Sequence, residues 1–310
     1  MRRWLFPLIV LLALLAGACG HGSGPNRAGQ SPAAGAWPVT VDTPGGKLTV
    51  KQRPARIVSL SPTATELLFA IQAGGQVVAA DDNSDYPAGA PRTKLSAYQP
   101  NVEAIAGYRP DLVVYSNDPG GLRAALGKLG IPALLQPAAT RLDDTYAQLG
   151  QLGRVTGHQP EADRLAASMR TQIRQIVASA RPERPLTYYH ELDKNLFSAT
   201  SKTFIGQLYG LLGLRNIADR ADAKGGGYPQ LSAEYVVKAD PDLIFLADTR
   251  CCGQSAATVA ARPGWRRLHA VKDHAVFALD DDVASRWGPR TVDFLRTIAG
   301  DLKAAGAVRS

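Results

Sequence analysis

The stretch "YRPDLVVY" (Tyr108–Tyr115) has a near copy, "ADPDLIFL" (Ala239–Leu246), in the second half of a 310-residue chain. Each copy has a glutamate seven positions before its proline, Glu103 in the first and Glu234 in the second. The apolar run after each Pro-Asp pair predicts a short buried strand. The chain therefore builds the same strand twice, each time with an acidic residue upstream.

The residues around the first copy alternate between strand and helix patterns. Trp37–Pro54 alternates apolar and polar residues around a Thr-Pro-Gly-Gly turn, which predicts a β-hairpin. Four buried strands follow, in "RIVSLSP", "VVAAD", "PDLVVY" and "PALLQP". The segments "TATELLFAIQAGG", "PNVEAIAGYR" and "GGLRAALGKLG" between them have helical spacing. This alternation is typical of an α/β unit with a mainly parallel sheet.

The same order returns after a helical middle segment. Residues 142–184 form a linker whose helical patterning is divided by Gly157 and Pro160. An apolar stripe in its second piece predicts a helix about five turns long. The stripe consists of Leu165, Met169, Ile173, Ile176 and Val177. Strand patterns recur in "LTYYHEL", "PDLIFL" and "AVFALD". We predict two similar α/β lobes, residues 37–141 and 185–310, joined by one long rigid helix, with a ligand cleft between them.

The N-terminus predicts export and a lipid anchor. "MRRWLFPLIVLLALLAGAC" has two arginines, an apolar run too short for a membrane span, and small residues before Cys19. Residues 1–18 are therefore predicted as a signal peptide. Ala16-Gly17-Ala18-Cys19 is similar to a bacterial lipobox, and a plain secretory leader with a chance cysteine is the alternative. Residues 19–36 predict a flexible tether behind the lipidated cysteine, on the outer side of the cell membrane.

With Cys19 lipidated, the remaining cysteines are the neighbours Cys251 and Cys252. Outside the cytoplasm such a pair favours a disulfide. The strained geometry of a bridge between neighbours favours free thiols in a buried loop instead, and both interpretations stay open. Two cysteines without nearby histidines do not make a zinc site, and we predict no metal and no cofactor.

Charge and motifs favour binding over catalysis. The net charge of +8 comes from 35 basic and 27 acidic residues that are scattered along the chain, so a solvated surface explains them better than nucleic-acid binding does. The sequence has neither a G-x-S-x-G elbow nor a phosphate-binding loop. His190 ends a predicted strand, where it could face the cleft or serve as an ordinary loop histidine.

Aromatic and polar side chains follow the predicted strands or precede the short helices. The carboxyl ends of parallel strands meet at one edge of a sheet, so we expect these loops on the same side of both lobes. They suit a large, flat, partly apolar ligand that a few polar groups orient. The predicted ligand contacts are Asn83, Tyr86, Tyr98, Phe197, Tyr228, Asp282, Arg286 and Trp287.

Six segments carry a family resemblance: "RIVSLSPTATELLFAI", "NSDYP", "NVEAIAGYRPDLVV", "GLLGLRNIAD", "YPQLSAEYVVKADPDLIFL" and "WRRLHAVKDHAVFALDDD". From Trp37 to Leu302 the chain resembles the substrate-binding lipoproteins of iron–siderophore, haem and cobalamin ABC importers, and is most similar to the cobalamin-binding members. The resemblance implies that one surface glutamate on each lobe docks into arginine pockets of a permease dimer. Glu103 and Glu234 match those positions, and two solvated helix glutamates are the alternative. We expect a monomer.

The resemblance also implies ligand contacts. Residues that match the cobalamin-binding pattern are Tyr98, Phe197, Tyr228, Asp282 and Arg286, with tyrosine in place of tryptophan at the first and third. Asn83 stands where that pattern has a tyrosine, and Ser285 where it has a glutamate. An anionic ferric siderophore would instead use Arg286, Arg290, Arg92 or Lys94.

These patterns predict a lipid-anchored solute-binding protein that captures a corrinoid in the cleft and delivers it to a permease. A ferric siderophore or haem is the alternative ligand. Two other classes stay open. One is a cell-surface interaction protein. The other is an extracytoplasmic chelatase-like enzyme, which would need a metal or acid–base set from His190, Glu191, Asp193 and Asp282.

Overall fold

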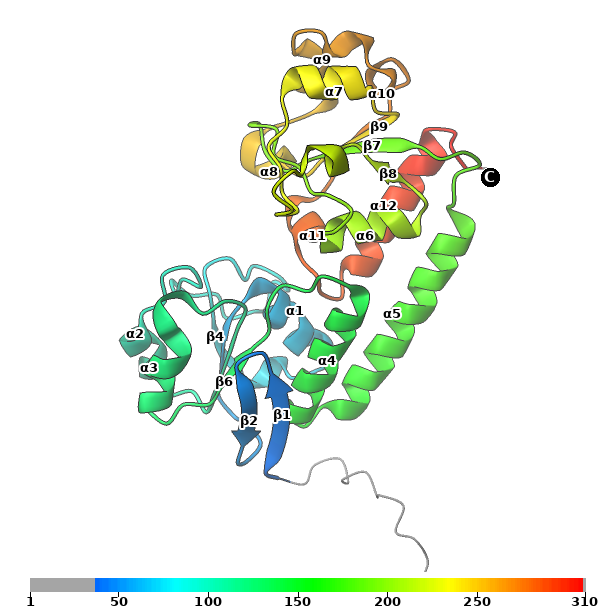
Figure 1. The fold of residues 1–310 in the computed structure, drawn as a ribbon. Coiled ribbons are helices and arrows are strands. Elements are labelled where there is room, and N and C mark those ends of the chain that lie inside the picture. Colours follow the sequence, from blue (N-terminus) through cyan, green and yellow to red (C-terminus); the bar gives the residue numbers. More distant parts are fainter. Residues whose placement is uncertain (1–36, 309–310) are drawn as a thin grey trace, which may run out of the picture. The chain divides into compact units, whose positions relative to one another are not determined.

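The computed structural model describes residues 37–308 (Figure 1). The predicted signal peptide (1–18), Cys19 and the tether (19–36) lie outside the described residues. Within residues 37–308, no helix is both long enough and apolar enough to cross a membrane.

The N-terminal lobe contains a β-hairpin and a four-stranded parallel sheet. The hairpin pairs β1 (Val39–Thr43) with β2 (Gly46–Val50) around the predicted turn. The sheet has the order β4-β3-β5-β6, with strands β3 (Ile57–Leu60), β4 (Val77–Ala80), β5 (Leu112–Tyr115) and β6 (Ala133–Leu135). The helical elements are α1 (Pro62–Ala70), η1 (Gly74–Gln76), α2 (Val102–Gly107), η2 (Pro119–Gly121) and α3 (Leu122–Lys128).

The C-terminal lobe repeats this topology. Its parallel sheet has the order β10-β9-β7-β8, with strands β7 (Thr187–Glu191), β8 (Arg215–Asn216), β9 (Leu243–Leu246) and β10 (Val276–Ala278). Counted along each lobe, both sheets run second–first–third–fourth. The prediction of two similar α/β lobes with parallel sheets is therefore confirmed.

Several short elements of this lobe have no counterpart in the sequence predictions. Strand β8 spans two residues and helix α8 four, which is too short for a hydrophobic period to show. The helical elements of the lobe are α6 (Phe204–Leu211), η3 (Ala218–Ala221), α7 (Ala233–Ala239), α8 (Thr249–Cys252), α9 (Ala256–Ala261), η4 (Trp265–Arg267), α10 (His269–Lys272), α11 (Asp281–Ser285) and α12 (Thr291–Ala304).

Two helices lie between the two sheets in the chain. Helix α4 (Leu142–Thr156) packs on the N-terminal lobe, and the longer α5 (Gln159–Ser179) runs from one lobe to the other (Figure 1). Gly157 ends α4 in a left-handed conformation (φ 77°), and Pro160 lies in the first turn of α5, where proline needs no hydrogen-bond partner. Ala162 of α5 is buried in the N-terminal core, and Met169 and Ile173 are buried in the C-terminal core. The predicted long connecting helix is thus packed into both lobes.

The repeated Pro-Asp stretch has the same structural role in each lobe. The Asp111 carboxylate accepts a hydrogen bond of 2.9 Å from the backbone N–H of Arg56, just before β3. The Asp242 carboxylate accepts one of 2.7 Å from the N–H of Thr187, the first residue of β7. Each aspartate thereby fixes the start of a central strand from the start of its neighbour, which accounts for the duplicated stretch.

Candidate functional site

Each lobe has one edge where the carboxyl ends of its strands lie level. In the N-terminal sheet, Tyr115 pairs with Leu60 and Leu135. In the C-terminal sheet, Leu246 pairs with Glu191 and Ala278. The loops that follow these strands share an edge, as expected for ligand sites of parallel α/β sheets.

A pocket of about 410 Å³ is lined by loops of both lobes. Trp287 in its wall is fixed by an indole N–H that donates to Gln148 Oε1 of α4 (3.0 Å). The predicted ligand residues that line the pocket are Asn83, Tyr98, Asp282, Arg286 and Trp287. Residues about 200 positions apart in the sequence thus meet in one cavity.

Phe197 and Tyr228 do not line that pocket but lie on two adjacent loops of the C-terminal lobe. The backbone N–H of Ser198 donates to the carbonyl of Pro229 (3.0 Å), and Phe197 forms a β-bridge with Gln230. Both loops are at the edge where β7 ends, because the N–H of Leu192 donates to the Phe197 carbonyl. These two aromatics therefore lie at the carboxyl end of β7, outside the pocket lining.

Tyr86, the remaining predicted contact, has one ring face covered by Arg290, whose guanidinium carbon is 4.3 Å from the ring centre. Six large hydrophobic side chains are exposed in the described part of the chain, and four of these are predicted ligand aromatics. The exposed fractions are 46% for Tyr86, 72% for Tyr98, 37% for Phe197 and 52% for Tyr228. These four exposed aromatics are therefore the candidates for ligand contact.

The sequence patterns missed a buried glutamate, Glu66 of α1. Its carboxylate accepts hydrogen bonds from Arg286 Nη1 (2.8 Å) and from Arg290 Nε and Nη2 (3.0 and 2.6 Å). Both arginines belong to the C-terminal lobe, so these ion pairs join the lobes next to the pocket. One acidic residue inside the apolar helix "TATELLFAI" was the available signal, because a buried carboxylate needs a cationic partner.

Arg286 is surrounded by acids. Besides Glu66, its guanidinium donates to Asp85 and Asp282, at 2.9 Å each. Its charge is already balanced, although it lines the pocket. Of the cations suggested for an anionic siderophore, Arg92 is the exposed one in the pocket wall.

The C-terminal lobe has its own buried acids. Glu191, the last residue of β7, forms a two-pronged ion pair with Arg262, with both N–O distances 2.6 Å. Asp248 follows β9 and is also buried, and neither of its carboxylate oxygens has a hydrogen-bond donor within residues 37–308. Burial, aided by the negative charge of Glu191, raises the pKa of Asp248 to about 7.

The residues suggested for a chelatase-like site do not gather. His190 is fully buried in β7, where its Nδ1 is 3.0 Å from the Tyr209 hydroxyl, and burial lowers its pKa to about 3. It neither faces the cleft nor lies in a loop. Glu191 is paired with Arg262, and Asp282 with Arg286. Across the described residues, no group of three or more His, Cys, Asp or Glu side chains could hold a metal ion.

Glu103 and Glu234 occupy equivalent exposed positions. Each lies in the first turn of a short helix, Glu103 in α2 and Glu234 in α7. Both helices begin with a side-chain cap, Asn101 on the N–H of Ala104 and Ser232 on that of Tyr235. Each lobe thus has an exposed glutamate at the same position of an equivalent helix.

A larger groove, of about 650 Å³, is lined mainly by side chains of α4, α5 and α6. It contains none of the predicted ligand residues, and its lining does not come from the level strand ends. The smaller pocket therefore remains the candidate site.

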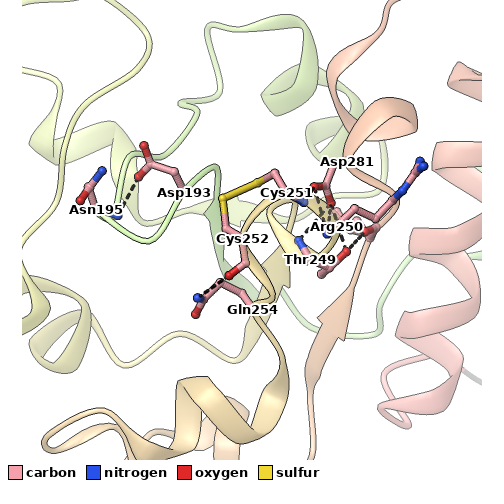
Figure 2. Close-up of a disulfide and its surroundings, with 9 residues drawn as sticks. Asp193, Asn195, Thr249, Arg250, Cys251, Cys252, Gln254 and Asp281 are labelled. Atoms are coloured by element: carbon pink, nitrogen blue, oxygen red, sulfur yellow. Dashed lines mark hydrogen bonds between the residues drawn. A yellow bond between two sulfur atoms is a disulfide. The ribbon is translucent and has the colours of Figure 1, made fainter. Parts of the chain in front are cut away.

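Cys251 and Cys252 are joined by a disulfide in α8 (Figure 2). Both residues are exposed, so they do not lie in a buried loop.

Two α/β lobes with a long connecting helix and a pocket between their strand-end loops define a two-lobed binding protein. Residues 57–283 match the periplasmic binding protein family, and the chain belongs to that family.

The chain is similar to three proteins in particular. The uncharacterized ABC transporter substrate-binding lipoprotein YvrC of Bacillus subtilis is 27% identical over 97% of both chains. A cobalamin-binding protein of Halobacterium salinarum is 31% identical over 96% of this chain and 85% of its own. The heme-binding protein RhuT of Roseiflexus has the same fold, with a TM-score of 0.70 at 24% identity over 81% of this chain and 98% of that one.

Proposed function

We propose that this protein is the extracytoplasmic solute-binding component of an ABC importer, and that it captures a corrinoid in the pocket between its lobes. The observation that carries the proposal is the set of four exposed aromatics around the level strand ends. Exposing them to water is unfavourable unless a ligand covers them. The full burial of His190 and the pairing of Glu191 with Arg262 give no support to a catalytic role.

The chemistry of the site favours a flat, mostly uncharged macrocycle. Tyr98, Phe197 and Tyr228 offer ring faces for stacking. Arg286 and Arg290 are already paired with Glu66, which leaves little positive charge for a polyanion. A corrinoid fits this balance best, and similarity to a cobalamin-binding protein supports it. Haem, also flat, and a ferric siderophore, which would use Arg92, are the alternative ligands.

The test is a panel of cobalamin, cobinamide, haem and ferric siderophores in thermal-shift and titration experiments. A ligand that binds the folded state raises the melting temperature by mass action. Replacing Tyr98, Phe197 and Tyr228 together by alanine should weaken binding of the best ligand by at least about 2 kcal/mol, or about thirtyfold. Leu129→Ala is the control, because the exposed fraction of Leu129 (54%) lies within the range of the three aromatics but the residue is at the end of α3. Undiminished binding in the triple variant would place the site elsewhere.

The lipid anchor is part of the same proposal. The apolar leader and the small residues before Cys19 support it, and a relative is named a lipoprotein. Cys19→Ser should move the protein from the membrane fraction to the soluble or secreted fraction. An unchanged distribution, with no lipid mass on the N-terminal peptide, would contradict the anchor.

A further inference from the structure

The Cys251–Cys252 disulfide lies at the ligand-binding edge of the C-terminal lobe. Helix α8 follows β9, whose last residue, Leu246, is level with the ends of β7 and β10. Figure 2 places Asp193 and Asn195 in the surroundings of the disulfide. They belong to the loop that carries Phe197, because Asp193 Oδ1 accepts the backbone N–H groups of Asn195 and Phe197.

The disulfide is coupled to the pocket through α11. Figure 2 shows Asp281 reaching the first turn of α8, where it accepts the N–H groups of Thr249 (3.0 Å), Arg250 (3.1 Å) and Cys251 (2.9 Å). The Arg250 guanidinium in turn donates to Asp282 Oδ2 (3.0 Å).

Asp282 continues this connection into the pocket. Its other oxygen accepts a hydrogen bond from Arg286 (2.9 Å), and Arg286 pairs with Glu66 of the other lobe. Asp282 and Arg286 both line the pocket. A continuous set of polar contacts therefore runs from the disulfide to the pocket wall and across to the N-terminal lobe.

Global stability does not explain this disulfide. A cross-link stabilises mainly by restricting the unfolded chain, and this effect shrinks with the length of the closed loop. Adjacent residues close the shortest loop possible. What the bond does restrict is the local backbone of α8. Both cysteine residues are exposed, and their polarisable sulfur suits contact with a flat ring.

We propose that the Cys251–Cys252 disulfide is a ligand-contacting part of the C-terminal wall of the site, and that tight binding requires it to be oxidised. Its sulfur atoms contact the face or rim of the flat macrocycle, and its constraint on α8 keeps Arg250 and Asp282 in place. This inference rests on the proposed function for its ligand. It adds a contact that the aromatic set lacks, and it makes affinity depend on redox state.

The first test is the double variant Cys251→Ser/Cys252→Ser, which matches the reduced protein in size and needs no reductant. Its affinity for the best panel ligand should fall about tenfold, the upper range of a sulfur–ring contact. The melting temperature of the ligand-free protein should change by no more than about 4 °C. Unchanged affinity overturns the proposal. So does a loss of affinity accompanied by a much larger drop in melting temperature, because the bond would then serve the fold.

The second test measures contact directly. A dithiol reductant converts the disulfide to two thiols, taking up two electrons and two protons while the dithiol itself becomes a disulfide. A saturating concentration of the best panel ligand should slow this reduction several-fold. The reduction is followed over time by alkylating the new thiols and detecting the product by mass spectrometry. An equal rate with and without ligand overturns the contact. In a parallel titration, the reductant should lower the ligand affinity of the wild type and leave that of the double serine variant, the control, unchanged.

A third measurement separates this inference from the proposed function. If no panel ligand binds the wild-type protein, the proposed function fails, and amide hydrogen exchange decides the coupling alone. Reduction should raise exchange in residues 280–286 as well as in α8, because Asp281 and Arg250 join the two segments. Exchange that rises only in α8 overturns the coupling.

Discussion

The two lobes share a topology but neutralise their buried glutamates differently. Glu66 in the N-terminal lobe receives both of its arginines, Arg286 and Arg290, from the other lobe. Glu191 in the C-terminal lobe receives Arg262 from its own lobe. The ion pairs of Glu66 therefore join the two lobes, whereas the ion pair of Glu191 lies within the C-terminal lobe.

Each lobe also has a buried aspartate directly after a strand, Asp81 after β4 and Asp248 after β9. Asp81, at the end of β4, accepts a hydrogen bond from Ser84, and burial raises its pKa to about 6. Asp248 lacks a donor within residues 37–308, and its pKa is raised further, to about 7. Asp248 of the C-terminal lobe is thus less well compensated than Asp81, although the Glu191–Arg262 ion pair near it lies within one lobe.

The largest effects are expected from removing the glutamate charges one at a time. Glu66→Gln removes the carboxylate shared by the buried Arg286 and the half-buried Arg290. It should cost about 3–5 kcal/mol of unfolding free energy, although Arg286 keeps Asp85 and Asp282. Glu191→Gln should cost less, because the nearby Asp248 can still compensate Arg262. Chemical denaturation of both variants measures the difference.

Amide hydrogen exchange shows which segments each of the two glutamate variants loosens. Glu66→Gln should loosen both α1 and the start of α12, since Arg290 immediately precedes that helix. Glu191→Gln should affect only the C-terminal lobe. A larger cost at Glu191, or exchange changes confined to the N-terminal lobe after Glu66→Gln, would remove the distinction between the two glutamates.

Local signals explain how much of the fold was predictable. The boundary between α4 and α5 was found because Gly157 and Pro160 act on their own backbone. The two lobes were found because the Pro-Asp strand repeats. Strand β8 and helix α8 were missed because two to four residues show no period and are stabilised by tertiary contacts.

For the candidate site, the sequence predicted which loops contribute but not how their side chains pair. Tyr98 and Phe197 follow predicted strands or precede short helices, so they were predicted at the edge of the sheets where the strands end. Periodicity could not show that Arg286 would meet Glu66 across 220 positions, because that pair depends on how the lobes pack. Arg286 was therefore predicted as a ligand contact without the carboxylates that balance its charge.

The raised aspartate pKa values predict that the stability of the fold depends on pH. The folded state holds the Asp248 proton more tightly than the unfolded chain, so stability falls as pH rises from about 4 through about 7, by up to about 1.4 kcal/mol per pH unit. Asp81 and Asp301, whose burial raises their pKa to about 6, contribute at lower pH. His190 opposes the trend below pH 6.5, because burial lowers its pKa to about 3.

Denaturation of asparagine variants between pH 5 and 8 separates the contributions of Asp248 and Asp81 to the unfolding free energy. Asp248→Asn mimics the protonated acid, so it should be more stable than the wild type at pH 8 and close to it at pH 5. Asp81→Asn should reduce the pH dependence of the unfolding free energy only below about pH 7. If both variants keep the wild-type slope between pH 6.5 and 8, the Asp248 carboxyl does not titrate there.

The smallest effects are expected at Glu103 and Glu234, where the lobes are most alike. Both are exposed in the first turn of equivalent helices, so charge reversal should leave folding and ligand affinity unchanged. If each glutamate pairs with a permease arginine, Glu103→Lys and Glu234→Lys should each slow complex formation and uptake, because rim charges mainly set orientation and association rate. Each alanine variant should cost about 1 kcal/mol or less of docking energy, and high salt should weaken the wild-type complex.

The pattern across the two lobes carries more information than either variant alone. Similar losses at Glu103 and Glu234, with a larger loss in the double variant, would mean that the lobes meet equivalent permease subunits even though their interiors have diverged. Asp163→Lys on α5 is the matched control, since it reverses an exposed charge outside α2 and α7. Should Asp163→Lys slow uptake as much as Glu103→Lys, the effect would come from net charge rather than docking. A loss at only one glutamate would instead show that the functional asymmetry of the lobes extends from Glu66 and Glu191 to the surface.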